Sequence, residues 1–224
     1  MAFRVVIPIF ANVTQLDFTG PAQMFAKVPD LELCVAAKDP HPVETDSGFA
    51  VAAPYTFADC PAADLVCVPG GSGVMDAIRD PYFLSFVERQ CAQARYITSV
   101  CTGLFALGAI GLVKGRRVTS HWGYTDVIAD CGGVFTEGRV VVDGNLITAG
   151  GVTSGVDFSL TVIAEVFGEE TARLIQLAMQ YNPQPPFESG HPSAAQPQTL
   201  AAANTIYAKR ARDMRETLKA VRRG

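Results

Sequence analysis

The segment 96-YITSVCTGLFALGAIG-111 decides the fold of this 224-residue chain. Residues 96–100 are mostly β-branched or aromatic and predict a short strand. Cys101 follows at once, and the apolar run 104–110 predicts a helix. A strand, a sharp turn and a helix in this order are typical of a nucleophile elbow, here with a cysteine on the turn. The sequence therefore makes Cys101 a candidate nucleophile at the end of a sheet.

Two features of this turn bear on the chemistry of Cys101. The first N–H groups and the positive end of the following helix point toward the sulfur, which favours a thiolate. Gly103 has no side chain at the position where the helix must begin close to the sheet. A reduced cysteine is also commonly a small buried hydrophobe, so the local sequence leaves both a nucleophile and a structural cysteine open.

The composition describes a protein with a substantial core and a mildly acidic surface. Hydrophobic residues make up 49% of the chain and charged residues 18%. The net charge is -4, and the only basic cluster lies at the far C-terminus, which argues against a nucleic-acid partner. The opening MAFRVVIPIF lacks the longer apolar region of a signal peptide, and no apolar run is long enough to span a membrane. We therefore expect a cytoplasmic protein with neither nucleic acid nor membrane as a partner.

The cysteines and histidines form no recognisable metal or disulfide pattern. None of the six cysteines belongs to a CxxC pair, and the three histidines are widely separated. A disulfide framework is not expected in a chain of this size without a secretion signal. The cysteines other than Cys101 are therefore predicted to be reduced and mostly buried. These are Cys34, Cys60, Cys67, Cys91 and Cys131.

Hydrophobic periodicity predicts strands alternating with helices along most of the chain. The continuous apolar run 3–10 is typical of a central parallel strand. A helix is predicted from about residue 17, with Thr19 as its cap and Pro21 in its first turn. Further strands are predicted at 31–37, 64–68, 135–142 and 146–149, short strands or a hairpin within 41–54, a hairpin turn at 143–145, and further helices at 81–94, 124–130, 156–166, 171–180 and 199–223. The simplest architecture is an α/β, doubly wound sheet with helices on both faces and a C-terminal helical extension.

Two glycine-rich turns are expected at the same edge of the sheet as the elbow. Residues 69–73 and 150–155 each follow a predicted strand, and parallel sheets place ligands at the edge where their strands end. The N–H groups of Gly70 and Gly71 can bind an anion or a developing negative charge. A turn that only needs positive φ angles has the same sequence, so both interpretations stay open.

Asp17 follows the first predicted strand and is expected at this edge too. A carboxylate beside a thiol can share its proton or serve as a general acid and base. The commoner role of an aspartate at the start of a helix is to cap it. The apolar neighbours Leu16, Phe18 and Pro21 suggest an enclosed site, in which the pKa of the carboxyl would rise.

Taken together, these motifs resemble the DJ-1/PfpI superfamily. The resemblance is carried by Asp17, by PGG at 69–71, by VCTG at 100–103, by HW at 121–122 and by GGVTSGVDF at 150–158. It implies a flavodoxin-like α/β fold whose strand-to-helix turn carries a reactive cysteine.

Within that superfamily, four segments resemble the isocyanide hydratase group. They are QLDFTGP at 15–21, SVCTG at 99–103, SHW at 120–122 and YNPQPPF at 181–187. The resemblance implies a hydro-lyase that adds water to an isocyanide, giving an N-substituted formamide through a thioimidate on Cys101. It implies no metal and no organic cofactor.

The same resemblance assigns roles to individual residues. Cys101 would be the nucleophile, Asp17 its acid and base partner, and Thr102 a neighbouring polar contact. The backbone of Gly71 and Ser72 would face the same pocket. Side chains expected to meet an apolar isocyanide are Phe18, Trp122 and Val152.

Differences between this sequence and related branches of the superfamily bear on the alternative functions. Protease-like members carry a histidine where this chain has Thr102, which discounts a peptidase. The DJ-1 branch carries a glutamate where this chain has Asp17, which weakens a glyoxalase or deglycase. A redox-sensing protein that uses Cys101 without turnover remains an alternative. His121 either takes part or is a structural residue under the elbow. A DNA-binding regulator with a similar amino domain is also discounted, because it needs a helix-turn-helix domain and too few residues follow Phe187 to form one.

The C-terminal part is expected to serve the same domain or an interface. Residues 1–187 are assigned to the α/β domain, and 188–224 to an extension with a basic helix. This helix would dock on the parent domain or on a second copy. Because related proteins are commonly homodimers, we expect a homodimer.

Overall fold

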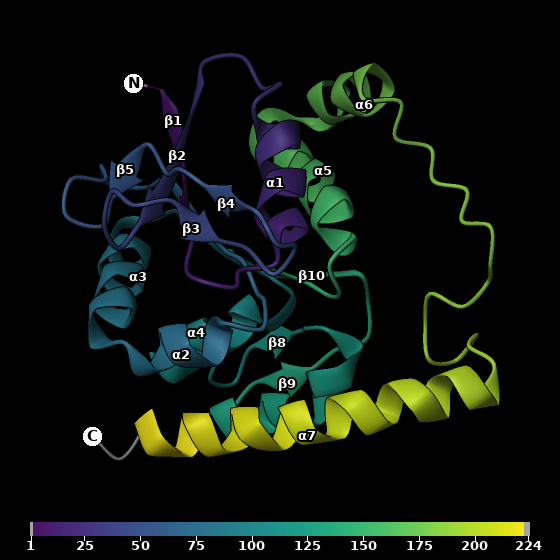
Figure 1. Cartoon of the computed structure of the whole chain (residues 1–224). Helices are drawn as coiled ribbons and strands as arrows, with labels where there is room; N and C mark the ends of the chain where they lie inside the picture. Colours follow the sequence, from purple (N-terminus) through teal and green to yellow (C-terminus); the bar gives the residue numbers. More distant parts are fainter. Residues whose placement is uncertain (1, 222–224) are drawn as a thin grey trace.

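A seven-stranded sheet forms the centre of the fold in a computed structural model that describes residues 2–221 (Figure 1). Its strand order is β10-β11-β7-β6-β1-β2-β5. Every neighbouring pair is parallel except β10 with β11, which is antiparallel at the edge. The strands are β1 (Phe3–Pro8), β2 (Leu31–Ala37), β5 (Tyr55–Thr56), β6 (Leu65–Val68), β7 (Tyr96–Val100), β10 (Val140–Asp143) and β11 (Leu146–Ala149). The predicted α/β, doubly wound sheet is confirmed.

Helices cover both faces of this sheet (Figure 1). One layer contains α1 (Gln15–Phe25), α5 (Ser154–Phe167) and α6 (Glu169–Ala178), and the other contains α2 (Val74–Arg79), α3 (Pro81–Gln93) and α4 (Leu104–Ala109). Outside the second layer lie the 3₁₀ helix η2 (Trp122–Cys131) and the long helix α7 (Pro197–Val221). The described residues contain no helix with the length and apolar character needed to cross a membrane.

The central strands are buried on both faces, as their continuous apolar sequences predict. Val5, Val6 and Ile7 of β1 and all four residues of β6 are inaccessible to solvent. Such burial is typical of parallel strands covered by helices on both sides. The central strands therefore form a rigid support for the loops at their ends.

The path of the chain brings several loops to one edge of the sheet. From β1 the chain moves outward through β2 and β5, and it then returns to the opposite side of β1 as β6. The order reverses at this point, so the loops after β1 and β6 diverge and leave space between them. The loops after β7 and β11 follow along the same edge, which is where the site described below is found.

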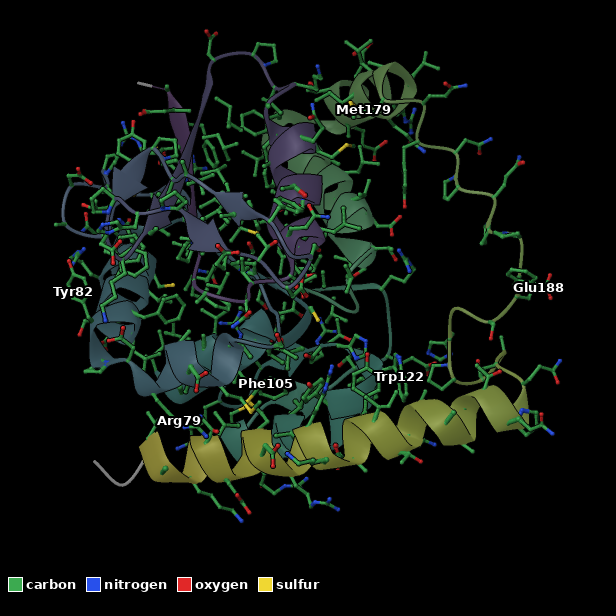
Figure 2. The ribbon with its side chains drawn as sticks, in the orientation of Figure 1. Arg79, Tyr82, Phe105, Trp122, Met179 and Glu188 are labelled. Carbon is green, nitrogen blue, oxygen red and sulfur yellow. The ribbon has the colours of Figure 1, made fainter. Side chains whose placement is uncertain are left out.

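Helix α7 packs on the chain's own domain through its C-terminal half. Met214 and Leu218 are buried, and Arg215 forms an ion pair with Asp130 at 2.6 Å. From α2, the Arg79 guanidinium donates to the Thr217 hydroxyl at 2.6 Å (Figure 2). The helix begins at Pro197, slightly before the predicted start. Its predicted last residues, Arg222 and Arg223, lie outside the described residues.

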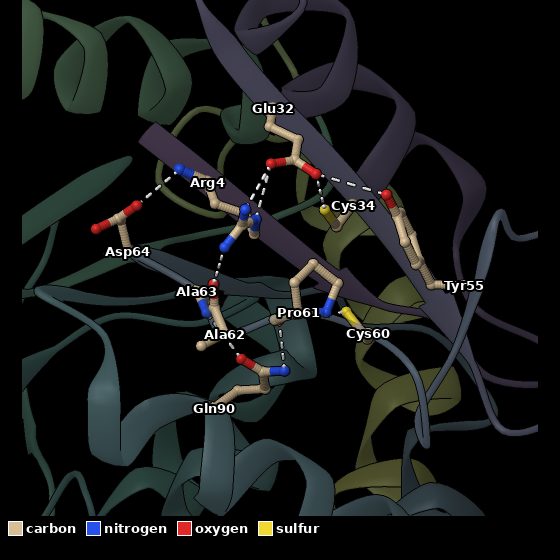
Figure 3. A network of polar contacts seen from close by, with 10 residues as sticks. All are labelled: Arg4, Glu32, Cys34, Tyr55, Cys60, Pro61, Ala62, Ala63, Asp64 and Gln90. Atoms are coloured by element: carbon tan, nitrogen blue, oxygen red, sulfur yellow. Dashed lines mark hydrogen bonds and ion pairs between the residues drawn. The ribbon is translucent and has the colours of Figure 1, made fainter. Parts of the chain in front are cut away.

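A polar network holds the opposite edge of the sheet, where the parallel strands begin (Figure 3). Arg4 of β1 donates to the Glu32 carboxylate of β2 from Nε at 2.9 Å and from Nη2 at 2.7 Å. The Tyr55 hydroxyl and the Cys34 thiol donate to the other oxygen of Glu32, at 3.5 Å and 3.7 Å. Three strands are thereby tied together around a carboxylate with both oxygens partnered.

Helix α1 begins earlier than predicted. The N–H of Asp17 donates to the carbonyl of Thr14 at 3.0 Å, so the first turn starts before Asp17 and Thr14 holds the cap position. Thr19 therefore lies inside the helix, where its hydroxyl donates to the Gln15 carbonyl at 2.9 Å, and Pro21 is an interior residue. Thr14 makes no side-chain cap hydrogen bond, because its hydroxyl donates to Asp46; its N–H donates to the Gly70 carbonyl at 3.0 Å, and these tertiary contacts fix where the helix begins.

Three other elements differ from or extend the prediction. The predicted strand 135–142 is two strands, because β9 (Val134–Phe135) pairs with β8 (Arg117–Val118) before β10 joins the main sheet. Helix α2 was not predicted, since its six residues give too short a pattern. The predicted hairpin after β10 is confirmed, and the short strands within 41–54 are β3 (Val43–Glu44) and β4 (Ala50–Val51).

Candidate active site

Cys101 occupies the sharp turn between β7 and the 3₁₀ turn η1 (Cys101–Gly103), which leads into α4. Its φ of 56° lies in the left-handed region, which costs a non-glycine residue roughly 1–2 kcal/mol. The Cys101 N–H donates to the Gly150 carbonyl at 2.9 Å, and its carbonyl accepts from the Ser120 hydroxyl at 2.7 Å. Hydrogen bonds from two other loops therefore hold the strained residue in place.

Gly103 is required at this turn, as the sequence indicates. A Cβ at this position would lie 2.1 Å from the Val68 carbonyl oxygen, at the end of β6, and 2.8 Å from the Pro69 backbone. Any side chain would therefore force the start of α4 away from the sheet. This close approach places the elbow directly against the loop that follows β6.

The side chain of Asp17 is fully buried beside the elbow. Its Oδ2 accepts from the Gly70 N–H at 2.9 Å, while Oδ1 has no hydrogen-bond partner within residues 2–221. Burial raises the pKa of Asp17 from 3.8 to about 7, and the Gly70 N–H and the Cys101 thiol oppose this rise. The carboxyl can therefore hold or release a proton near neutral pH.

The thiol of Cys101 is protonated in the resting site. Burial raises its pKa well above the usual value, and the negative charge of Asp17 raises it further. The N–H and hydroxyl of Thr102 act in the opposite direction but do not prevail. The Thr102 N–H at the helix start favours the thiolate, in the direction predicted, but desolvation and the nearby carboxylate outweigh it.

The glycine turn after β6 completes the cluster. The Gly71 N–H donates to the Thr102 hydroxyl at 3.1 Å, and the Gly70 N–H is bound to Asp17. The N–H groups predicted to bind an anion are therefore engaged, and the anion at Gly70 is the chain's own carboxylate. A Cβ on Gly70 would lie 2.5 Å from the Thr102 hydroxyl and 2.9 Å from Asp17 Oδ2. Ser72 is exposed just beyond this turn.

A cavity of about 470 Å³ adjoins the elbow. Ser120 and Gly150, the two residues bonded to the Cys101 backbone, both contribute to its wall. Trp122 and Val152 line it, as expected of residues that meet a substrate. The other lining residues are Thr119, His121, Thr125, Phe135, Glu137, Gly138, Arg139, Gly151, Thr153, Ser154, Gly190 and His191.

Phe18 does not line this cavity. Only 3% of its surface is exposed, and it belongs to the hydrophobic core beneath α1. The helix carries the residue after Asp17 away from the edge of the sheet, so Phe18 supports the site without reaching it. Because Phe18 follows Asp17 directly in the sequence, the sequence alone did not show that the two side chains point to different places.

His121 is a structural residue at the start of η2. Its Nδ1 accepts from the Gly123 N–H at 3.1 Å, which caps the helix. Burial lowers the pKa of His121 to about 4, and the charge of Arg210 lowers it further, so the ring is neutral at neutral pH. Of the two interpretations open from the sequence, this geometry fits the structural one.

Two residues near Cys101 have no counterpart in the sequence-based site. The charge of a Cys101 thiolate acts on the pKa of both Tyr124, from η2, and Tyr207, from α7. Nothing in the sequence links Tyr207 to the elbow. Gly123, between the two aromatic residues of η2, is the one local sign that another group packs closely there. Within residues 2–221, no group of three or more His, Cys, Asp or Glu side chains is arranged to hold a metal ion.

Comparisons with known proteins identify the family of this fold. The DJ-1/PfpI family model matches residues 3–165. Isonitrile hydratase of Pseudomonas putida is 47% identical over 195 residues, which cover 87% of this chain and 86% of that protein. A THiJ/PfpI family protein from Pseudomonas syringae is 35% identical and superimposes with a TM-score of 0.94 over 97% of this chain and 91% of its own. Oxidised DJ-1 of Toxoplasma gondii, 22% identical with a TM-score of 0.72, shares the fold over 81% of this chain and 100% of its own.

Proposed function

The chain belongs to the DJ-1/PfpI family, and we propose that it is an isonitrile hydratase, which adds water to an isocyanide to give an N-substituted formamide. One observation carries the proposal: the strained Cys101 lies beside a buried Asp17 whose pKa is about 7 and whose Oδ1 has no partner among the described residues. The similarity to the Pseudomonas putida enzyme supports the same reaction.

The first step of the proposed reaction forms a bond between Cys101 and the terminal carbon of the isocyanide. Asp17 takes the thiol proton as the sulfur attacks, and it delivers this proton to the same carbon. The product is a thioimidate, in which the carbon carries the sulfur, one hydrogen and a double bond to nitrogen. Because the pKa of Asp17 is about 7 and that of the Cys101 thiol is raised well above its usual value, an ionised Asp17 beside a protonated thiol is a populated state near neutral pH, and this state starts the reaction.

The second step releases the product. Asp17 orients a water molecule, accepts one of its protons, and the oxygen bonds to the thioimidate carbon. Asp17 passes this proton to the nitrogen, the remaining proton of the water moves to the sulfur as the carbon–sulfur bond breaks, and the thiol is restored. The balance is one isocyanide plus one water giving one formamide, which is the work of a hydro-lyase. Cys101, Asp17 and water supply every group, so the proposed route is independent of metals and organic cofactors.

Incubation with cyclohexyl isocyanide tests this function directly. The formyl proton of N-cyclohexylformamide in the NMR spectrum measures turnover, and the Cys101→Ala variant is the control. We expect the formamide with the parent protein and none with the variant. Absence of formamide from both cyclohexyl and phenyl isocyanide would overturn the proposal.

A redox sensor is the alternative that uses the same cysteine. Oxidation by peroxide proceeds through the thiolate, and the raised pKa of the Cys101 thiol disfavours that form. Peptide mapping after brief peroxide treatment distinguishes the two functions. The hydratase proposal expects Cys101 to oxidise slowly compared with a free thiol such as glutathione.

We also propose that the protein acts as a cytoplasmic homodimer. Leu174 and Leu177 of α6 are 67% and 78% exposed, which is unusual for large apolar side chains and suits a covered surface. Light scattering at micromolar concentration measures the mass. A monomer mass would refute the dimer without affecting the proposed chemistry.

A further inference from the structure

Four rings pack together where η2 meets α7. The ring of Tyr207, from α7, lies 4.7 Å from that of His121, 4.9 Å from that of Trp122 and 5.9 Å from that of Tyr124, centroid to centroid. Edge-on and tilted contacts at these distances are favourable aromatic geometries. Figure 2 shows Trp122 directly above α7. The aromatic cluster, defined as these four residues, thus joins the loop after the elbow to the C-terminal helix.

The Tyr207 ring can pack against η2 only because residue 123 is a glycine. A Cβ on Gly123 would lie 2.5 Å from Cγ and 2.7 Å from Cδ1 of the Tyr207 ring. The Arg210 guanidinium lies over the ring of Tyr207, with its central carbon 5.7 Å from the ring centroid. Tyr207 is therefore enclosed between the backbone of η2 and a charged side chain of its own helix.

Helix α7 is anchored so that Tyr207 keeps this position. Arg215 binds both Asp126 and Asp130 of η2, at 3.2 Å and 2.6 Å. Before Tyr207, by contrast, the helix is mostly open to solvent, and Ile206 is 55% exposed. Tyr207 is thus the point where the docked part of α7 begins.

Two residues of the aromatic cluster form part of the wall of the cavity beside the elbow. His121 and Trp122 line the 470 Å³ cavity, and the rings of both contact Tyr207, which does not line it. The same cavity reaches Ser120 and Gly150, which are bonded to the Cys101 backbone. Cys101 is not among the residues that line the cavity, but the cavity reaches the residues that hold the Cys101 backbone in place. His121 is neutral near pH 7, so the aromatic part of the wall carries no charge, while Glu137 and Arg139 bring charged side chains to another part of it.

We propose that this cavity receives the organic group of the isocyanide, that an aryl group fits it better than a small alkyl group, and that Tyr207 is a positioning residue that fixes the Trp122 wall. The inference rests on the proposed hydratase function and adds the substrate class and a role for α7. The cavity volume suits a ring-bearing ligand, and its aromatic wall offers edge-on and stacked contacts to an aryl ring. The family model ends at residue 165, so this wall lies partly outside the region common to the family.

Steady-state kinetics with two substrates test the role of Tyr207. For Tyr207→Ala, we expect the KM for phenyl isocyanide to rise about tenfold, because the wall loses its support, with kcat changed less than about threefold. The KM for methyl isocyanide should change little. Tyr207→Phe should behave as the parent, since the ring and not the hydroxyl supports Trp122. Ile206→Ala is the matched control on the same helix and should change neither substrate.

A binding experiment separates this inference from the proposed reaction. Trp122 is the chain's one tryptophan, so its fluorescence reports on this wall. N-Phenylformamide is titrated into Cys101→Ala, which cannot turn over. We expect a saturable change in emission, and an affinity about tenfold weaker when Tyr207→Ala is added.

The outcomes separate the two proposals. Saturable binding without turnover of any isocyanide by the parent protein would remove the hydratase function and still support an aryl site in this cavity. Normal turnover with an unchanged ratio of phenyl to methyl KM in Tyr207→Ala would overturn the inference and leave the function intact. If Tyr207→Ala does not fold, Trp122→Leu replaces it, and an unchanged KM ratio in that variant overturns the inference equally.

Discussion

Each end of the central sheet holds a carboxyl group beside a thiol, and the two carboxyl groups differ in their hydrogen-bond partners and in their burial. Where the parallel strands begin, Glu32 accepts from the Cys34 thiol and from two N–H groups of Arg4. Where they end, Asp17 lies beside the Cys101 thiol and accepts from the Gly70 N–H, and no cation within residues 2–221 forms an ion pair with its carboxylate. The hydrogen bond from Arg4 is the largest cause that lowers the pKa of Glu32, whereas burial raises that of Asp17 to about 7.

The comparison shows that the hydrogen-bond partner of a carboxyl group and its access to water decide whether it stays ionised. The type of residue does not decide this. Both thiols have raised pKa values, with burial as the largest cause. Only the carboxyls differ: Glu32 is held as an anion, and Asp17 can exchange a proton near neutral pH. The Glu32–Cys34 pair therefore ties strands together, while the Asp17–Cys101 pair is suited to catalysis.

The largest expected effect comes from removing the thiol at each end. Cys101→Ala should reduce hydration of cyclohexyl isocyanide to the uncatalysed background, because the covalent intermediate cannot form. Cys34→Ala should keep kcat and KM and lose about 1 kcal/mol of stability through lost packing. Formamide production and thermal unfolding measure the two. Near-normal turnover by Cys101→Ala would show that the thiol of the Asp17–Cys101 pair is no more catalytic than that of the Glu32–Cys34 pair.

The next effect comes from neutralising each carboxyl. Asp17→Asn keeps an acceptor for the Gly70 N–H but cannot exchange a proton, so turnover should fall about a hundredfold or more. Glu32→Gln should leave turnover unchanged. The rate at which iodoacetamide alkylates Cys101, followed across pH by peptide mapping, should change in Asp17→Asn alone. Equal turnover and alkylation profiles for Asp17→Asn and the parent would reduce Asp17 to a structural residue.

The two carboxyls should also give stability opposite dependences on pH. The pKa of Asp17 is higher in the folded state, at about 7, than its ordinary 3.8, so its protonation favours folding. The unfolding free energy of the parent minus that of Asp17→Asn should therefore fall by at most roughly 4 kcal/mol as pH rises from 4 to 7, and then level.

Glu32 provides the reversed case for the same measurement. Its pKa is lowered from 4.5 in the folded state, so its contribution is present above that pH and is lost as pH falls below it. The difference in unfolding free energy between the parent and Glu32→Gln should therefore disappear at acid pH. Urea unfolding from pH 3.5 to 8 gives both curves, and two curves of the same slope would contradict the assigned causes.

The smallest effect tests the threonine at the elbow. Thr102→Val removes the acceptor of the Gly71 N–H and a contact to the sulfur, and we expect a threefold to tenfold loss of turnover, about 1 kcal/mol in the barrier. Thr98→Val, earlier on β7, removes the hydroxyl that donates to the Val66 carbonyl at 2.8 Å. That control should lose stability and keep kcat. Equal kinetic losses for both variants would mean that Thr102 acts through stability alone.

The sequence by itself determined the strand–turn–helix elbow at Cys101 and the doubly wound α/β class of the fold. These features are local: an apolar run, a Cys–Thr–Gly turn and a second apolar run are adjacent in the chain, and Gly103 is the residue that the close approach to Val68 demands. The start of α1 was less certain, because Thr14 and Thr19 both suit a cap and the preceding loop chooses between them.

The apolar neighbours of Asp17 predicted that its pKa would rise, but only the tertiary structure decided how the thiol ionises and what surrounds the pair. Desolvation and charge act through space, so these pKa values depend on Asp17 of α1, Gly70 of the loop after β6 and Cys101 of η1 meeting at one place. Tyr207 was not predicted for a similar reason. It contacts the residues of the cavity wall only because α7 packs against η2. Sequence periodicity reports which side of an element is apolar, and it carries no information on which distant residue that side meets.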